Sequence, residues 1–347
     1  MNVKAWQVET PGGEFREITL PLSSPGPQKV LVRIAAGGVN PLDTKIRAGA
    51  AAHARQPLPA ILGLDMAGIV EAVGPDVAAF RPGDEVYGMV GGVGGMQGTL
   101  AEFILADASL LAQKPRNLSM RQAAALPLVT ITAWEGLVDH ARIDPFATTA
   151  EHTTTEHKIP DQRSVLVHAG AGGVGHVAVQ LAVASGARVF ATVSPDKAAI
   201  VSGFGATPID YRSQSVEQYV DALTGGNGFD IVYDTVGGGT IDASFAAVKR
   251  YTGHVLSCLG WSTHALAPLS FRSATYSGVF TLYPLLSGDG TARAHQGEIL
   301  AHVTKLVEAG KLSPLLSEQR FTTGDINEAH AAVARGALGK VVVEIEG

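Results

Sequence analysis

In the first third of the chain, hydrophobic and polar residues alternate over short stretches, which turn residues such as Pro25, Gly74 and Gly83 separate. A period of two residues predicts strands with one buried face. The stretches cover residues 4–9, 29–34, 67–73, 85–87 and 100–104. We therefore expect a small, mostly β domain at the start of the chain.

Between about residues 164 and 282 the pattern changes to continuous apolar runs, separated by stretches with helical spacing. Runs without alternation are typical of strands that helices cover on both faces, as in parallel sheets. The runs cover residues 165–167, 188–193, 231–233, 254–257 and 278–282. This part of the chain is predicted to be an α/β domain with a doubly wound parallel sheet.

The last part of the chain returns to short elements. They are a helix at residues 297–309, a strand near 318–321, a helix capped by Thr323 or Asp325, and a strand at 340–345. We assign these final strands to the first domain. The expected domains are therefore residues 1–128 with 298–347, and residues 129–297.

Composition narrows the class of protein. The 347 residues exceed what one hydrophobic core usually organises, and 46% hydrophobic with 17% charged residues excludes intrinsic disorder. A net charge of -6 gives no basic field for a phosphate backbone, so we expect no nucleic-acid partner. The single cysteine, Cys258, excludes an intramolecular disulfide and a four-cysteine zinc site. The most apolar stretch, residues 165–185, contains glycines and histidines, so we expect no membrane span and a cytoplasmic location.

Residues 145–159 are polar and rich in threonine, without periodicity. His152, Glu156 and His157 lie there, but their spacing suits no compact metal site. We expect a solvated surface loop.

A strand, a glycine turn and an amphipathic helix follow one another from Val165 to Ala182. This is the context that a dinucleotide-binding fingerprint requires. We expect Gly170 to allow the tight turn, Gly172 to let the backbone approach a pyrophosphate, and Gly175 to let the helix pack close to the strand. The first helical amides, those of Gly173, Val174 and Gly175, then face the phosphates.

The residues at the end of the next strand indicate whether the cofactor is NAD or NADP. NAD sites usually place Asp or Glu there to bind the ribose 2′-hydroxyl, whereas this chain has Ser194, Pro195, Asp196 and Lys197. Ser194 can hydrogen-bond a phosphate and Lys197 supplies a cation, which favours NADPH. The alternative makes Asp196 the ribose ligand, although it is better placed to cap a helix.

Several motifs resemble the medium-chain dehydrogenase/reductase superfamily, in its zinc-independent quinone oxidoreductase and zeta-crystallin branch. Besides the glycine turn, they lie at residues 38–44, 62–71, 80–88, 123–127, 132–134 and 339–342. The resemblance covers nearly the whole chain. It implies a GroES-like catalytic domain from both chain ends, a Rossmann domain between them, and an active site in the cleft.

The same resemblance implies chemistry without a metal. Zinc-dependent relatives bind their catalytic metal with a Cys at the position of Asn40 and a His at the position of Leu64. Neither an amide nor an aliphatic side chain replaces those ligands, so nothing polarises a substrate carbonyl as a Lewis acid. Quinones and α,β-unsaturated carbonyls accept hydride without one, which makes them the expected substrates.

By resemblance, Asn40 and Asp43 line the cleft near the nicotinamide, and Thr132 contacts the cofactor. Alternatively, Asn40 only sets a turn before Pro41, Asp43 caps a helix, and Thr132 bonds its own helix.

Other positions are expected to bind the cofactor. Lys197 and Tyr211 match residues that hold the adenosine 2′-phosphate, although Tyr211 could be a plain strand aromatic. Leu259 and Lys340 are further expected cofactor contacts, whereas Cys258 is expected to be a small buried residue rather than a nucleophile.

The chain departs from the family at Lys45 and at Ala50 and Ala51, where many members have tyrosine. The aromatic wall of the substrate pocket is therefore altered. Lys45 could face the cleft as a donor, or be solvated.

We expect an NADPH-dependent, metal-free reductase of quinones or of enones and enals. The rivals are a zinc alcohol dehydrogenase with unusual ligands and a cofactor-binding protein without turnover. We also expect a homodimer that forms through residues 278–282 as the exposed edge strand.

Overall fold

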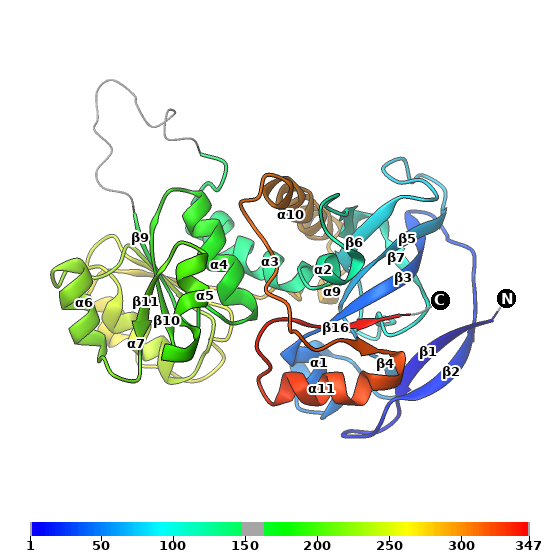
Figure 1. The fold of residues 1–347 in the computed structure, drawn as a ribbon, viewed down its shortest axis with the longest axis horizontal. Helices are drawn as coiled ribbons and strands as arrows, with labels where there is room; N and C mark the ends of the chain where they lie inside the picture. The colour runs from blue at the N-terminus through cyan, green and yellow to red at the C-terminus, as the bar shows by residue number, and fades with distance from the viewer. Residues whose placement is uncertain (1, 148–162, 346–347) are drawn as a thin grey trace. The chain divides into compact units, whose positions relative to one another are not determined.

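The computed structural model describes residues 2–147 and 163–345, so His152, Glu156 and His157 lie outside the described residues (Figure 1). The chain forms two compact units. Unit 1 comprises Met1–Ile131 and Thr281–Gly347, and unit 2 comprises Thr132–Phe280. Within the described ranges, no helix is long and apolar enough to span a membrane.

The strands of unit 1 are β1 (Asn2–Val8), β2 (Arg16–Pro21), β3 (Lys29–Val39), β4 (Ala60–Ile61), β5 (Asp65–Val73), β6 (Glu85–Met89), β7 (Phe103–Asp107), β8 (Leu111–Gln113), β15 (Phe321–Thr322) and β16 (Val341–Glu344). Its helices are α1 (Pro41–Arg47), η1 (Ala52–Ala54), η2 (Ala108–Leu110), α2 (Met120–Ala124), α9 (Tyr283–Ser287), α10 (Gly290–Glu308), η5 (Thr323–Asp325) and α11 (Ile326–Ala334). Helix α3 (Pro127–Trp134) contains the boundary between the units.

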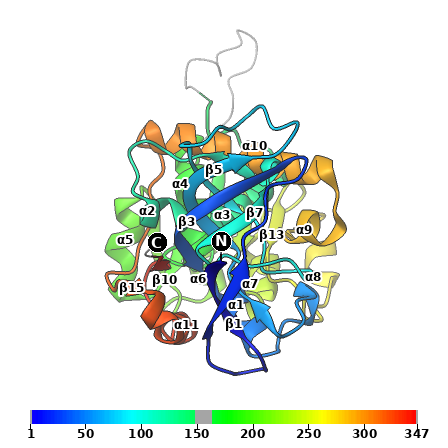
Figure 2. The same ribbon diagram turned by 90° about the vertical axis from the view of Figure 1, so that its right-hand side faces the viewer.

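The main sheet of unit 1 joins both parts of the chain. Its order is β15-β16-β3-β5-β6-β8, and β7 also pairs with β3, which Figure 2 shows running across this unit. The register places Val341 of β16 opposite Val39, and Asp65 of β5 opposite Gly38. The residues that flank these positions, Asn40 and Lys340, therefore meet Asp65 at one end of three adjacent strands.

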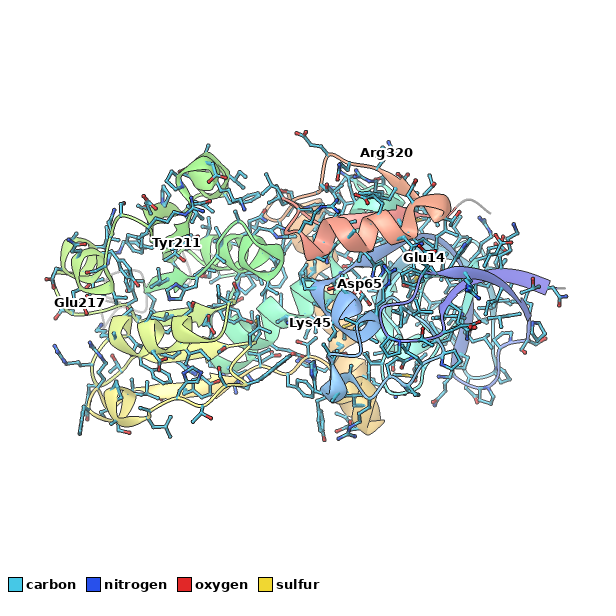
Figure 3. The ribbon with its side chains drawn as sticks, turned by 90° about the horizontal axis from the view of Figure 1, so that it is seen from below. Glu14, Lys45, Asp65, Tyr211, Glu217 and Arg320 are labelled. Carbon is cyan, nitrogen blue, oxygen red and sulfur yellow. The ribbon has the colours of Figure 1, made fainter. Side chains whose placement is uncertain are left out.

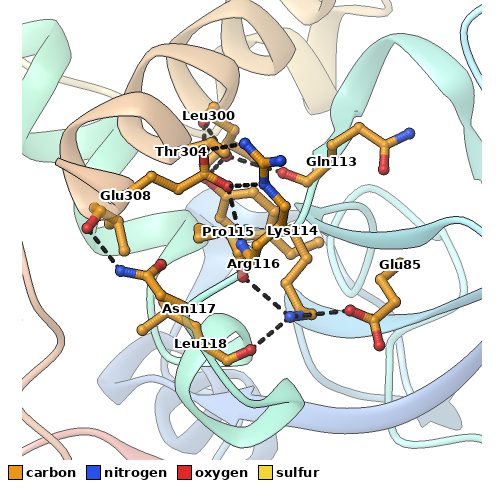
Figure 4. Close-up of polar contacts among 12 residues, drawn as sticks. Glu85, Gln113, Lys114, Pro115, Arg116, Asn117, Leu118, Leu300, Thr304 and Glu308 are labelled. Carbon is orange, nitrogen blue, oxygen red and sulfur yellow. Dashed lines mark hydrogen bonds and ion pairs between the residues drawn. The ribbon is translucent and has the colours of Figure 1, made fainter.

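Helix α10 is fastened to the segment that follows β8 (Figure 4). The guanidinium of Arg116 donates to Glu308 at 3.1 Å, and the Asn117 amide donates to the Val307 carbonyl at 3.0 Å. Lys114 is buried beside them. Its ammonium donates to the Pro115 and Leu118 carbonyls and pairs with Glu85 at 3.0 Å, which satisfies the charge.

The strands of unit 2 are β9 (Ser164–Val167), β10 (Arg188–Val193), β11 (Thr207–Asp210), β12 (Ile231–Asp234), β13 (His254–Ser257) and β14 (Thr275–Gly278). Its helical elements are η3, a π-helix (Glu135–His140), then α4 (Gly173–Ala184), η4 (Pro195–Lys197), α5 (Ala198–Gly203), α6 (Val216–Thr224), α7 (Gly239–Ala247) and α8 (Ala267–Ser270).

All six strands of unit 2 are parallel, in the order β11-β10-β9-β12-β13-β14. In chain order the strands are added on one side of β9 up to β11 and on its other side from β12 onward. Because crossovers are right-handed, the helices that connect these two sets of strands lie on opposite faces of the sheet. Apolar side chains fill the interior, among them Leu166, Phe190, Phe229 and Val232. The predicted GroES-like domain plus doubly wound Rossmann sheet is confirmed.

The structure differs from the expected elements in three places. The predicted strand at 278–282 instead ends at Gly278, because Val279 makes the last ladder bond, to the Ser257 carbonyl, and α9 with its early Pro284 follows. The helix predicted at 297–309 starts earlier, at Gly290, where Asp289 caps it by accepting from Thr291 and Ala292. The strand near 318–321 is β15, at Phe321–Thr322. Residues 281–297 consequently group with unit 1, whereas we expected them in the dinucleotide domain.

Candidate functional site

The glycine turn between β9 and α4 is held by its own backbone and by Thr192 of the neighbouring strand. The Ala169 amide donates to the Thr192 hydroxyl at 3.1 Å, and the Gly170 amide donates to the Thr192 carbonyl at 3.1 Å. Helix α4 then begins at Gly173, with Gly172 as its N-cap. The amides of Gly173, Val174 and Gly175 have no acceptor within the helix and carry its positive dipole end, so the turn fits a phosphate.

The role of Gly170 differs from our expectation. The left-handed residue of the turn is Ala169, with φ at 53°, so Gly170 is not the residue that provides the tight turn. Gly170 is needed for space, because an added Cβ would lie 2.5 Å from the Cβ of Ala191. A Cβ on Gly175 would lie 2.1 Å from the Ala169 carbonyl, which confirms the close packing of helix on turn.

His168 lies directly before this turn and was not among the expected site residues. Its ring is buried, and Nδ1 lies 3.2 Å from the Thr192 hydroxyl. Burial lowers the pKa of His168 to about 4, so the imidazole is neutral at physiological pH. It supports the turn as a neutral group.

The carboxyl ends of β10 and β11 bring together the residues expected at the adenosine end of the cofactor. The pairing of Val193 with Asp210 places Ser194 next to Tyr211, which is 54% exposed, and Lys197 follows in η4. Arg212 joins them, with its guanidinium 5.9 Å from the centre of the Tyr211 ring. Sequence analysis missed Arg212, although its position after Tyr211 at a strand end was the available signal.

Asp196 belongs to the same group. A hydrogen bond from Ser194 and the charges of Lys197 and Arg212 lower the pKa of the Asp196 carboxyl. Its side chain is exposed, and η4, which contains it, starts at Pro195 with no side-chain cap. The helix-capping role that we expected for Asp196 is therefore absent.

The ends of β12 and β13 are organised by Asp234, which is fully buried. Its carboxylate accepts hydrogen bonds from the amides of Val236 and Gly237 at 3.0 Å, and from the Ser257 hydroxyl at 2.7 Å. The Ser257 hydroxyl in turn accepts from the Leu259 amide at 3.2 Å. One side chain thus fixes both loops that follow these strands, where ligands of open sheets bind.

Cys258 lies in the same loop and is half-buried, and desolvation is the main cause that raises the pKa of its thiol to about 12. A thiol with that pKa is protonated and unreactive at neutral pH.

Thr132 opens unit 2, near the end of α3. Its side chain is buried, and its carbonyl accepts a hydrogen bond from the hydroxyl of Tyr233 at 2.7 Å. Gly136 of η3 packs on the same ring, since an added Cβ would lie 2.7 Å from it. These contacts anchor the segment, and the cofactor contact expected of Thr132 stays a prediction.

In unit 1, four residues form a buried polar cluster at the shared strand end. The Asn40 amide nitrogen donates to Asp65 at 2.9 Å, and the Asn40 amide oxygen accepts from Lys340. Asp65 also accepts from the Leu128 amide at 2.9 Å. Asp43 accepts from the backbone amide of Asn40 at 2.7 Å and so caps α1, as the alternative interpretation proposed. Asp65, which is fully buried and is labelled in Figure 3, was missed as a partner of this group.

Burial determines the charges in this cluster. It raises the pKa of Asp43 to about 7, and the neighbouring Asp65 adds to this increase. It raises the pKa of Asp65 to about 6, against the opposing effects of Lys340 and Asn40. Burial also lowers the pKa of Lys340, which both carboxyls oppose. Lys340 was expected to bind the cofactor, but its ammonium is engaged by Asn40 and lies near the two carboxyls.

By the resemblance given above, Asn40 and Leu64 stand where zinc-dependent relatives have metal ligands, and Asn40 belongs to this cluster. Leu64 is fully buried and offers no ligand atom. Among residues 2–147 and 163–345, no group of three His, Cys, Asp or Glu side chains could hold a metal. The site offers amide N–H, carboxyl and ammonium groups, which can donate hydrogen bonds and hold protons.

Comparison with known proteins identifies the family. Residues 26–116 match the alcohol dehydrogenase GroES-like domain, and residues 204–343 match the family described as zinc-binding dehydrogenase. The chloroplastic NADPH-dependent alkenal/one oxidoreductase of Arabidopsis thaliana is 33% identical over 324 residues, which are 91% of this chain and 72% of the relative.

Solved structures agree. An alcohol dehydrogenase superfamily protein from Novosphingobium aromaticivorans is 52% identical with a TM-score of 0.91, over 99% of this chain and 100% of that one. The quinone oxidoreductase from Coxiella burnetii is 26% identical with a TM-score of 0.79, over 100% of both chains.

These similarities confirm the expected family and an oxidoreductase that uses a nicotinamide cofactor. They extend over both units, as the sequence motifs do. This chain belongs to the medium-chain dehydrogenase/reductase superfamily, in its zinc-independent, quinone oxidoreductase-like branch.

Proposed function

We propose that the protein is an NADPH-dependent, metal-independent reductase of quinones or α,β-unsaturated carbonyl compounds. One observation carries the proposal: the amide of Asn40, which by resemblance stands where zinc-dependent relatives have a metal-binding cysteine, is hydrogen-bonded to Asp65 and Lys340. Acceptors with conjugated carbonyls suit such a site, because their own conjugation spreads the charge that hydride transfer creates. The names of the Arabidopsis and Coxiella relatives, an alkenal/one oxidoreductase and a quinone oxidoreductase, support this substrate class.

The residues of unit 2 fit the cofactor. The free amides at the start of α4 suit the pyrophosphate, and a Cβ at Gly172 would lie 3.0 Å from the Ala169 carbonyl, so this position favours glycine. Lys197 and Arg212 offer cations for a 2′-phosphate, and Ser194 offers a hydroxyl. When bound, NADPH supplies the hydride.

Asn40 is the residue that we propose as hydrogen-bond donor to the acceptor oxygen. Its oxygen accepts from Lys340 and one N–H donates to Asp65, which fixes the orientation of the amide and leaves its second N–H. Asp43 and Asp65, with raised pKa values, are groups that can hold a proton near neutral pH. A neutral donor of fixed orientation suits a substrate whose negative charge is delocalised.

The test is NADPH oxidation with a panel of quinones, enals and enones, before and after exhaustive chelation. We expect turnover that survives chelation. Asn40→Ala should lower kcat by about 10-fold to 100-fold with NADPH affinity nearly intact, since one oxyanion donor is worth about this much or somewhat more. Stoichiometric zinc in the purified protein, with loss of activity when it is removed, would overturn the metal-independent function. An unchanged kcat in Asn40→Ala would overturn the role of Asn40 as hydrogen-bond donor.

We also propose that the protein is a homodimer in which β14 pairs with its copy. β14 is the edge of the sheet in unit 2, and Trp261, Leu266 and Phe271 nearby in the chain are 54%, 62% and 88% exposed. An open edge with exposed apolar residues favours pairing across a two-fold axis.

A further inference from the structure

A pocket of about 450 Å³ opens in unit 1 beside the C-terminal end of α1. Its wall runs from Ile46 to Pro57 and includes Gly49, Ala51 and Arg55. This volume lies within the range of small-molecule sites. The pocket and Asn40 adjoin opposite ends of α1, a helix of seven residues and roughly 10 Å in length.

The wall of the pocket is fixed in place. The Gln56 side chain accepts from the Gly95 amide at 2.8 Å and donates to the Met96 carbonyl at 3.2 Å. Arg55 has a left-handed backbone, with φ at 49°, and its amide donates to the Ala52 carbonyl at 3.1 Å. A non-glycine residue held in this conformation costs free energy, and such residues are concentrated at functional sites.

The wall of the pocket contains one cation, Arg55, and a second cation, Lys45, directly precedes the wall residue Ile46 in the sequence. Arg55 lines the pocket and Lys45 is exposed on α1, where Figure 3 labels it; neither has an ion pair or side-chain hydrogen bond with a described residue. Lys45 is close enough to His53 for its charge to lower the pKa of that imidazole, after the larger effect of burial. His53 is therefore neutral at physiological pH.

Acidic residues are missing from this wall. The sequence from Thr44 to Leu64 contains no Asp or Glu, although the whole chain has a net charge of -6. Arg47, the remaining cation of the segment, is used elsewhere: it donates to the Gly13 carbonyl and to Asn327. Asp43, just before the segment, is buried and bonded to the Asn40 amide. The wall of the pocket therefore carries the positive charge of Arg55 and no acidic residue.

We propose that this pocket binds an anionic group of the electron acceptor, a carboxylate, phosphate or sulfonate attached to the conjugated carbonyl scaffold. The inference rests on the proposed function and deepens it by naming the class of acceptor. Arg55 supplies a planar guanidinium that can bind an oxyanion through two N–H groups, and Lys45 adds charge. Ala51 and Ala52 in the wall have small side chains, which leave space for the group.

The experiment compares matched acceptors. One pair is an enone with a terminal carboxylate and its methyl ester; the other is a naphthoquinone with and without a sulfonate. We expect kcat/KM to favour the anionic member by about 10-fold or more at low ionic strength, and the preference to shrink as salt screens the contact. Equal kcat/KM within both pairs would overturn the inference while leaving the reductase function in place.

Substitutions of the two cations test which residue causes the preference for anionic acceptors. Arg55→Gln should reduce the anionic-to-neutral ratio of kcat/KM about 10-fold, Arg55→Lys should restore part of it, and Lys45→Gln should reduce it less. Lys311→Gln, at an exposed lysine after α10, is the matched control and should keep the ratio of the native protein. A ratio that Arg55→Gln leaves intact refutes the assignment. If no acceptor of either kind oxidises NADPH, the proposed function itself fails.

Discussion

Replacing Lys340 by methionine removes the one cation of the buried cluster while keeping a long apolar stem. Lys340 is 5% exposed, and its ammonium bonds the Asn40 amide oxygen near Asp43 and Asp65. Loss of one partner from a buried charged group costs about 3 to 5 kcal/mol, because the remaining charges stay desolvated. We therefore expect Lys340→Met to destabilise unit 1 by about 3 kcal/mol at pH values where the carboxyls are ionised.

The cost depends on pH in a predictable direction. Because the pKa of Asp43 is raised to about 7 and that of Asp65 to about 6, the native fold favours their protonated forms. Their contribution to stability is fully present below their ordinary pKa of 3.8 and is lost as pH rises through the folded values. Without Lys340 both pKa values rise further. The variant should accordingly be closest to the native protein at about pH 5.5 and furthest from it at about pH 8.

Hydrogen exchange of peptides from β3, β5 and β16 measures this locally, which matters because a chain with two units need not unfold in one step. At about pH 8, 3 kcal/mol corresponds to roughly 100-fold faster exchange through opening of unit 1. Lys114→Met is the control, since this buried lysine pairs with Glu85, whose side chain is 54% exposed. A Lys340 variant whose loss of protection is the same at both pH values would refute the reasoning.

Three further predictions follow from the site and the sheet edge. The double substitution of Lys197 and Arg212 by alanine should weaken NADPH binding by about 1.5 to 3 kcal/mol for each charged hydrogen bond lost. Calorimetric titration measures this, with NADH as the control. An equal loss of binding free energy for both nucleotides would contradict the 2′-phosphate assignment. Asp234→Asn places an amide against N–H donors, so the free energy of nucleotide binding should weaken by about 1 to 3 kcal/mol. Hydrogen exchange should also accelerate in the loops after β12 and β13. Unaltered exchange there would show that the carboxylate does not hold these loops. The Thr275 and Val279 amides donate toward β13, so the Tyr276 amide faces away from the sheet. Tyr276→Pro removes that outward amide and should give a monomer by light scattering without unfolding unit 2. A persistent dimer would place the interface elsewhere.

The sequence predicted those features whose determinants are local. Apolar runs located four of the six strands of the parallel sheet, β9, β10, β12 and β13, but missed β11 and placed β14 too late. The strand, glycines and helix from Val165 onward located the dinucleotide turn. The left-handed residue of that turn was misassigned because Ala169 adopts a conformation that propensity assigns to glycine. The hydrogen bonds that the turn makes with Thr192 offset the free-energy cost of this left-handed conformation.

The polar cluster was less predictable because it depends on sheet register. Asn40 was singled out and Asp65 lies in the motif at residues 62–71, but only the pairing of β16 with β3 and of β3 with β5 brings Lys340 to them. Burial, which sets their pKa values, is equally a property of the assembled sheet. Lys197 and Arg212 both act on the Asp196 carboxyl for a similar reason, since β11 lies beside β10.

The pairing of β16 with β3 also governs when unit 1 can be completed during synthesis. Unit 2 is continuous in sequence, so it can fold once Phe280 has left the ribosome. Unit 1 must wait for β16, and its contacts span nearly the full chain, which makes its closure slow. Until then the edge of β3 that receives β16 stays unpaired and Asp65 has no ammonium beside it. A nascent chain arrested before Val341 should therefore hold a protease-resistant unit 2 beside a unit 1 that chaperones still bind.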